Sequence, residues 1–403
     1  MVKVSVGYQD NCLHPLRLST AGMRIARLMG ARAIWFPDHF MGFAPKWMWT
    51  PDVVPAARVI HSMDALFDPV PMMTLAALKH RRVLIGTSVT DPIRRHPMSL
   101  AQTFVTLDHI SKGRAILGIG SGLRENTEPY GLDCEKRVAR LDEALKIIRM
   151  LWNSSGEPAS FEGRFWKLED AVFDIPLFHG KPPRLFIGAH FPRMLRMCGR
   201  WADGWLPGQK VDAAEYGSRL GVIREAADGA NRPMRDFTAC HTALVAFGAS
   251  RDQVLDRALK SKYCAYMAIG LPPEIWTEYG LEHPMGPDFA GFLEIVPSRV
   301  GKREVERALE QLTVALLERV FYVGTPEQIL DELAPLAGAG CRHFIIVNMG
   351  ALFTGRGVKD LWDTGKLMRG LKKLEAPPAG GDGVPTATRP FERSPAMLPR
   401  VPT

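Results

Sequence analysis

The chain has 403 residues, of which 46% are hydrophobic and 23% are charged, and its formal net charge is +8. This length allows one large barrel or two to three ordinary domains. No uninterrupted apolar run approaches the roughly 18 residues of a membrane span. The basic residues also lack the dense face and aromatic platforms that are typical of nucleic-acid binding. We therefore expect neither a membrane span nor a nucleic-acid partner.

The N-terminus, MVKVSVGYQDN, enters a strand pattern directly, without the basic start and apolar stretch of a secretory signal. We therefore expect a cytoplasmic protein. The six cysteines lie far apart with no CxxC pair, which favours reduced packing residues over a disulfide framework. The eleven histidines are also scattered and show no zinc-site spacing. We expect no metal.

Apolar runs rich in β-branched residues alternate with segments of helical period through the first half of the chain. This alternation is typical of βα units around a parallel sheet. Ser19 can cap the first helix and Gly30 can end it. Strands are expected at 2–8, at the start of AIWFPDHFMGF (33–43), at 83–90 and at 115–122, and helices at 19–30, 72–80, 98–111 and 137–152.

Two long interruptions divide the second half, at about 153–183, where SFEGRFWKLEDAVFDI predicts a hairpin, and at about 270–320. Thr325 caps a later helix with Pro326 at its first position. Further strands are expected at 184–189, 204–208, 237–248 and 343–349. Eight strands with helices between them favour a closed (β/α)8 TIM barrel, an α/β fold, over an open doubly wound sheet. We expect one domain over 1–375 and a disordered Pro- and Gly-rich tail over 376–403.

In such barrels the active site lies at the C-terminal ends of the strands. This rule selects Asp38-His39, the segment 88–91, the segment 121–126 and Ala189-His190, which should meet at one mouth. An imidazole there can donate a proton, with the neighbouring carboxylate orienting it or tuning its charge. A histidine held only by local hydrogen bonds is the alternative.

Two other segments suggest a bound cofactor. GIGSG (118–122) resembles a dinucleotide motif, but a loop, LRENTEPYG, follows it where that motif needs a helix. We prefer glycines that let a flat ring lie close to the strand end. Pro192 stands near a helix start, where free N–H groups and Arg193 could hold a phosphate. An ordinary helix with a surface arginine explains that segment equally well.

Taken together, several motifs resemble the luciferase-like flavin and deazaflavin oxidoreductases. They are DH (38–39), GTSVTD (86–91), RAILGIGSG (114–122), GAHFPRML (188–195) and VGTPEQILDEL (323–333). The chain is still more similar to one branch, the coenzyme F420-dependent phthiodiolone ketoreductases. EPYG (128–131), AHFPRMLR (189–196), GLPPEIW (270–276) and EHPMGPDFAG (282–291) carry that likeness, which covers roughly residues 3–375.

The resemblance implies a TIM barrel, usually a homodimer, that holds the deazaflavin coenzyme F420 over its mouth. His39 would be the proton donor or base, aided by Asp38. A non-prolyl cis peptide between Ser88 and Val89 would support the ring. The residues expected at the cofactor are Asp38, Ser88, Val89, Thr90, Asn126, Gly188, Ala189, His190 and Arg193, with Arg94 and Arg95 as further candidates for the phosphate and acidic tail.

The chain departs from several relatives at Leu123, where they carry a glutamate that is a proposed acid. Glu125 could compensate and is a further candidate for the substrate site, but in an extended loop it would point differently.

The expected reaction is hydride transfer between the deazaflavin C5 and a carbonyl or alcohol carbon. Phe43 and Trp47 suggest an apolar substrate such as a long-chain ketone, although a core or dimer contact explains these aromatics equally well. Alternatives are an FMN-dependent monooxygenase on the same fold and a cofactor-binding protein without turnover.

Overall fold

A computed structural model describes residues 1–378, and its centre is a closed barrel of eight parallel strands. Each strand pairs with the next in the order of the chain, and the last pairs with the first. The predicted (β/α)8 barrel is confirmed. Its strands are β2 (Ser5–Gln9), β3 (Ala33–Phe36), β4 (Leu84–Thr87), β5 (Ala115–Ile119), β8 (Arg184–Ile187), β9 (Gly204–Trp205), β10 (Thr238–Phe247) and β12 (His343–Asn348).

The barrel interior is filled by large side chains. All four residues of β3 are buried, as expected for a strand with helices on one side and a barrel core on the other. The Trp35 indole lies among Phe186, Leu206 and Ile345. A Cβ at Gly7 would lie 2.7 Å from the Trp35 ring nitrogen. Gly7 on β2 therefore makes room for the indole on β3.

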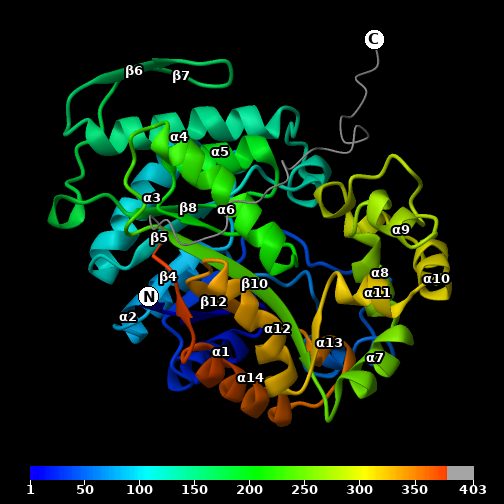
Figure 1. Cartoon of the computed structure of the whole chain (residues 1–403). Helices are drawn as coiled ribbons and strands as arrows, with labels where there is room; N and C mark the ends of the chain where they lie inside the picture. The colour runs from blue at the N-terminus through cyan, green and yellow to red at the C-terminus, as the bar shows by residue number, and fades with distance from the viewer. Residues whose placement is uncertain (379–403) are drawn as a thin grey trace.

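Eight helices cover the barrel from outside, with α1, α12 and α14 on one side of Figure 1 and α3 to α5 on the opposite side. Thr325 forms the predicted capping box with Gln328. The prediction that Ser19 caps the first helix is wrong, because this helix begins at Leu16 and Ser19 lies inside it. The helices are α1 (Leu16–Leu28), α2 (Pro69–Lys79), α3 (Pro97–Ser111), α4 (Arg137–Asn153), α5 (Pro192–Trp201), α6 (Ala213–Asp228), α12 (Pro326–Gly338) and α14 (Val358–Leu371).

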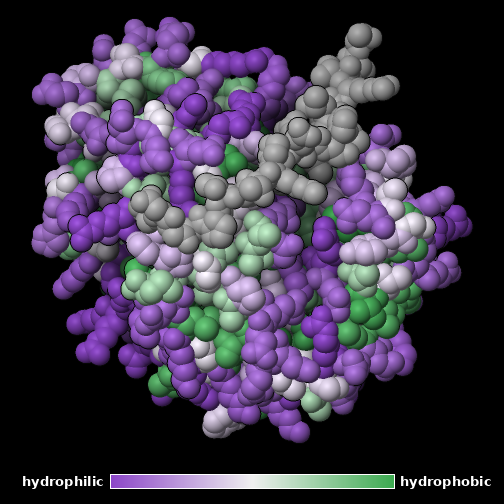
Figure 2. All heavy atoms as spheres, in the orientation of Figure 1, coloured by the Kyte–Doolittle hydropathy of each residue, from purple (hydrophilic) through white to green (hydrophobic). Residues whose placement is uncertain are grey.

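The two interruptions are structured insertions. The first contains the predicted hairpin, β6 (Ala159–Glu162) with β7 (Lys167–Ala171), outside α4. The second belongs to a group of short helices with its own hydrophobic cluster, which reaches the barrel at Ala246 and Val347, near the C-terminal ends of β10 and β12. Hydrophobic residues also gather on the surface near α7 and α11 (Figure 2). The helices are α7 (Arg251–Leu259), α8 (Lys262–Ile269), α9 (Pro273–Glu278), α10 (Lys302–Glu310), α11 (Val314–Glu318) and α13 (Gly350–Phe353).

Three short strands differ from the sequence prediction. β11 (Tyr322–Gly324) adds a parallel strand to the end of β10. β1 (Val2–Lys3) pairs with β13 (Glu375–Ala376), so the expected first strand is broken at Val4. Ala376, assigned to the tail, is therefore in a strand, and the rest of the tail beyond residue 378 lies outside the described residues. Across residues 1–378, no helix has the length and apolar character needed to cross a membrane.

Candidate active site

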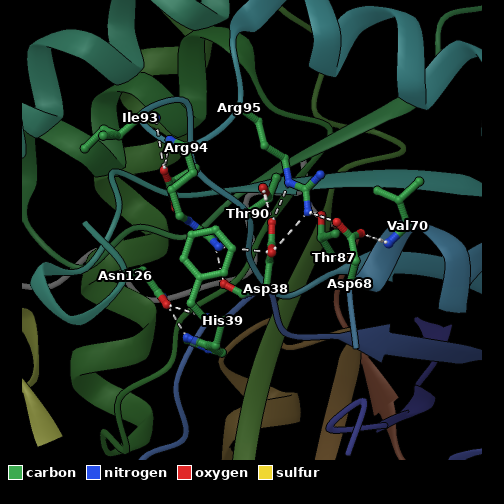
Figure 3. A network of polar contacts seen from close by, with 12 residues as sticks. Asp38, His39, Asp68, Val70, Thr87, Thr90, Ile93, Arg94, Arg95 and Asn126 are labelled. Carbon is green, nitrogen blue, oxygen red and sulfur yellow. Dashed lines mark hydrogen bonds and ion pairs between the residues drawn. The ribbon is translucent and has the colours of Figure 1, made fainter. Parts of the chain in front are cut away.

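The polar residues that follow β3, β4 and β5 meet at the C-terminal end of the barrel, as predicted. Asp38 and His39 follow β3, and Thr90 follows β4. Asn126 ends a single 3-10 turn, Arg124–Asn126, after β5. Thr90 contacts Asp38 and Asn126 contacts His39, so residues up to 87 positions apart in sequence form one network (Figure 3).

The buried Asp38 carboxylate accepts side-chain hydrogen bonds from three residues of the segment after β4. Thr90 Oγ1 donates at 2.6 Å, Arg94 Nη1 at 3.1 Å and Arg95 Nε at 2.9 Å. Burial by itself raises the pKa of Asp38, but the two guanidinium groups and the Thr90 hydroxyl outweigh it and lower the pKa overall. Asp38 is therefore ionised and pairs with two arginines. The hydrogen bond from the Thr90 hydroxyl also stabilises the ionised carboxylate.

The two arginines after β4 are paired with carboxylates of the same chain. Arg94 is 3% exposed, and its Nε donates to Asp91 at 2.6 Å while Nη1 donates to Asp38. Arg95 bridges Asp38 and Asp68. Both guanidinium groups are paired with carboxylates within the chain, and the expectation that they bind a cofactor phosphate and acidic tail stays a prediction.

The imidazole of His39 is held through one nitrogen. Its Nδ1 lies 2.9 Å from Glu125 Oε1 and 2.8 Å from Asn126 Nδ2. The Asn126 amide is itself oriented, because its Oδ1 accepts from the backbone N–H of Phe40 at 2.9 Å. The Phe43 ring packs edge-on against the imidazole, with 4.5 Å between centroids. Within residues 1–378 these polar contacts all involve Nδ1, which leaves Nε2 for a ligand.

The carboxylate nearest to His39 belongs to Glu125, and the expectation that Asp38 orients the imidazole is corrected accordingly. Glu125 is fully buried, and its Oε2 has no hydrogen-bond partner within the described residues. Burial raises the pKa of Glu125, and the nearby His39 and Arg94 only partly offset this. Leu123 is the N-cap residue of the tight turn. The segment forms this turn instead of an extended loop, and the turn directs the Glu125 side chain toward His39.

Tyr266 on α8 is a buried polar residue that the sequence reasoning missed. Its hydroxyl has no hydrogen-bond partner in the described chain. Burial, followed by the charge of Glu125, raises the pKa of Tyr266 well above its usual value. Nothing in KYCAYMAI distinguishes this side chain from the core residues around it.

The residues after β4 place Val89 against the hydrophobic cluster inside the barrel. The Ser88–Val89 peptide bond is cis, as the family resemblance implied, and both residues are half-buried. A Cβ at Gly120 would lie 2.8 Å from a Val89 methyl group, and a Cβ at Gly188 would lie 3.5 Å from it. The glycines at the ends of β5 and β8 therefore leave space around the Val89 side chain.

The segment after β8 contains three predicted site residues in different surroundings. Ala189 is buried in the core and its carbonyl accepts from Trp205 Nε1, so it supports the site without lining it. His190 Nδ1 is buried without a partner in residues 1–378, and burial followed by the charge of Arg219 lowers the pKa of His190 to about 3. Arg193 is exposed in the first turn of α5, whose start has no side-chain cap.

The two predicted substrate aromatics lie in different places. Phe43 contacts His39 directly. Trp47 is half-buried, packs against the hydrophobic cluster of the insertion and donates from Nε1 to the Val300 carbonyl. Phe43 therefore lies at the imidazole, whereas Trp47 belongs to the packing of the insertion.

Comparisons with known proteins show the family of this chain. The luciferase-like monooxygenase family matches residues 23–343. Phthiodiolone/phenolphthiodiolone dimycocerosates ketoreductase of Mycobacterium tuberculosis is 38% identical over 377 residues, which cover 91% of this chain and 98% of that protein. F420-dependent glucose-6-phosphate dehydrogenase of Nakamurella multipartita is 28% identical over 282 residues, or 68% of this chain and 74% of the relative.

A solved structure shows the same fold at low sequence identity. An F420-dependent secondary alcohol dehydrogenase in complex with an F420-acetone adduct superposes with a TM-score of 0.68 at 19% identity, covering 92% of this chain and 99% of that one. The match of the family to most of the chain, with the ketoreductase relatives, shows that this protein is an oxidoreductase of the luciferase-like monooxygenase family.

Proposed function

We propose that the protein is a coenzyme F420-dependent oxidoreductase that transfers hydride between the deazaflavin C5 and a carbonyl or alcohol carbon of an apolar, lipid-like substrate. The observation that carries the proposal is the imidazole of His39 at the C-terminal end of the barrel. Its Nδ1 is held by Glu125 and Asn126, and its Nε2 is left for a ligand. A histidine in this state can give a proton to, or take one from, an oxygen beside the reacting carbon.

The residues at the mouth fit a deazaflavin cofactor. The half-buried Val89 side chain offers an apolar support for a flat ring, and Gly188 beside it carries no side chain that would occupy the adjoining strand end. The uncapped start of α5, with the exposed Arg193, suits a phosphate. His190 Nδ1 is a buried polar atom that lacks a partner in residues 1–378. When bound, the cofactor supplies the hydride at its C5.

The chain's own residues then orient the substrate and handle the proton. His39 Nε2 donates a hydrogen bond to the substrate oxygen and supplies its proton during reduction, or withdraws it during oxidation. Asn126 keeps the imidazole in place through Nδ1. Phe43 and the hydrophobic cluster of the insertion exclude water from one side of the site.

The apolar substrate is inferred from two aromatic residues and from the relatives. Phe43 packs against His39, and Trp47 packs against the hydrophobic cluster of the insertion. The relative at 38% identity is named as a ketoreductase for phthiodiolone dimycocerosates. A cytoplasmic homodimer stays a prediction alongside this proposal.

The test is a titration of the purified protein with oxidised F420 and with FMN, followed by cofactor fluorescence or absorbance. We expect saturable binding of F420 that is at least tenfold tighter than binding of FMN. Reduced F420 should then be consumed with ketones, faster for long alkyl chains than for acetone. Tight binding of FMN with no response to F420 would overturn the proposal.

An FMN-dependent monooxygenase is the second candidate, because the matching family is described by that activity. It predicts oxygen consumption with reduced FMN, which the first proposal excludes. A binding protein without turnover is the third, because Leu123 stands where relatives carry an acid. It predicts that His39→Ala leaves F420 binding intact while the parent never turns over a ketone or an alcohol.

A further inference from the structure

The neighbours of His39 determine which of its two nitrogens carries a proton in the protein without ligand. The Phe40 N–H donates to Asn126 Oδ1, so the amide nitrogen of Asn126 must be the end that faces His39. An amide NH2 group only donates. It lies 2.8 Å from His39 Nδ1, and Nδ1 must therefore be an acceptor. The neutral imidazole then carries its proton on Nε2.

This assignment creates a conflict at Glu125 that a single proton removes. Glu125 Oε1 lies 2.9 Å from the same Nδ1, and an ionised carboxylate would place its lone pairs against the lone pair of Nδ1. A proton on Nδ1 would relieve that contact but would face the Asn126 amide hydrogens instead. A proton on Glu125 relieves the repulsion at both contacts, since the acid can donate to Nδ1 beside the Asn126 amide.

The surroundings of Glu125 also favour the neutral acid. The side chain is fully buried and Oε2 has no hydrogen-bond partner among residues 1–378, so an ionised carboxylate would leave one charged oxygen unsatisfied. Arg94, the nearby cation that opposes this, is already paired with Asp38 and Asp91. The other titratable groups that interact with Glu125 are Tyr130 and Tyr266, which are neutral at pH 7 and add no positive charge.

We propose that Glu125 is a positioning residue that stays protonated in the free protein and donates to Nδ1 of His39, which holds the ring in the tautomer with its proton on Nε2. Its role in turnover rests on the proposed function. During reduction, Nε2 gives its proton to the substrate oxygen while Nδ1 takes the proton of Glu125. The Oε1–H bond breaks, an Nδ1–H bond forms, the imidazole stays neutral and Glu125 becomes a carboxylate. Glu125 thereby supplies a proton through His39, although Leu123 stands at the position where several relatives carry a proposed acid.

The free protein provides the decisive test, without cofactor or substrate. Infrared difference spectra at pH 7 should show a protonated carboxyl band that disappears in E125Q. Glu128, three residues on, is half-exposed and paired with Arg124 and Arg299, and E128Q is the matched control that should leave the band unchanged. Nitrogen NMR of labelled histidine, assigned with H39Q, should place the His39 proton on Nε2. A band that E125Q does not remove, or a protonated Nδ1 in the parent at pH 7, overturns the proposal.

The variants E125Q and E125A distinguish a role of Glu125 in positioning His39 from a role in packing alone. The glutamine amide introduced by E125Q can still donate to Nδ1, so this variant should keep the parent tautomer but lose a transferable proton, and kcat should fall about a hundredfold with KM little changed. E125A should lose the tautomer preference as well. An E125Q protein with parental kcat overturns the relay. Cofactor binding is unaffected by these outcomes, so failure of F420 to bind is a separate result that bears only on the proposed function.

Discussion

The two ends of the barrel each hold a histidine, and the two side chains are satisfied differently. At the N-terminal end, His343 is 3% exposed, with Nδ1 2.7 Å from Ser5 Oγ and Nε2 3.0 Å from Trp35 Nε1. At the C-terminal end, His39 uses Nδ1 for Glu125 and Asn126. Both nitrogens of His343 are engaged in the core, whereas His39 keeps one for a ligand.

His343 also differs from His39 in that it lies beside a large cavity. Burial, followed by the charges of Arg184 and Arg32, lowers the pKa of His343 to about 3, so this ring is neutral throughout the physiological range. A cavity of about 520 Å³ opens beside it, lined by these arginines, yet the imidazole has no free nitrogen to offer. The volume of a cavity is therefore a poor guide to the functional site of this protein. A histidine nitrogen without a partner, on a ring held by a buried acid, is a better guide.

Removal of His39 should have the largest effect on function. We expect His39→Ala to lower kcat by about 10²- to 10⁴-fold, because a proton donor is lost, while the melting temperature changes little. The exposed His109 at the end of α3 provides the control, and His109→Ala should leave kcat unchanged. Equal losses in the two variants, measured by steady-state kinetics with reduced F420, would contradict the role of His39.

Removal of Asp38 should have the largest effect on stability. Asp38→Ala leaves Arg94 and Arg95 without their shared carboxylate in a mostly buried place, and the free energy of unfolding should fall by about 3 to 5 kcal/mol. Urea denaturation of the parent and the variant measures this difference in the free energy of unfolding. A loss below about 1 kcal/mol would show that this network does not stabilise the mouth.

The free energy of unfolding should depend on pH through the buried histidines. Because the folded-state pKa of His343 is about 3 and the unfolded value is about 6.5, the unfolded state binds the proton first. The contribution of His343 to the free energy of unfolding is therefore fully present well above pH 6.5, and it falls as the pH is lowered toward 3. Between pH 7 and pH 5 the loss from His343 should be about 2 kcal/mol. His343→Gln should reduce the slope of stability against pH, and an unchanged slope would contradict the assignment.

A smaller effect should follow from Ser5→Ala, which removes the partner of His343 Nδ1. The free energy of unfolding should fall by about 1 to 2 kcal/mol, because a buried nitrogen is left unsatisfied. Turnover per folded molecule should stay at the parental value, since Ser5 lies at the opposite end of the barrel. A change in kcat as large as the change for His39→Ala would remove the distinction between the two ends.

The barrel could be predicted from the sequence because its signals are local. The apolar period shows the strands, and the ends of the strands indicate where Asp38 and His39 converge with Asn126. β11 was missed because a three-residue strand has no measurable period. Ser19 was misplaced because Pro15 directly before Leu16 allows the helix to begin earlier.

The partners of the charged side chains could not be predicted, because they depend on contacts distant in the sequence. Arg94 and Arg95 follow β4, and the carboxylate that they share is 56 and 57 residues away. Glu125 was expected to point elsewhere in an extended loop, but one 3-10 turn directs it toward His39. The local sequence gives the residue types at the mouth, and the closure of the barrel decides which of them pair.

The most direct test of the central claim follows the nitrogen NMR signals of His39 and His343 while oxidised F420 is added to the labelled protein. The account predicts that the His39 signals shift saturably and that the His343 signals stay in place, with FMN producing a weaker response. A saturable F420 shift confined to His343, or no shift at His39 at saturating F420, would contradict it.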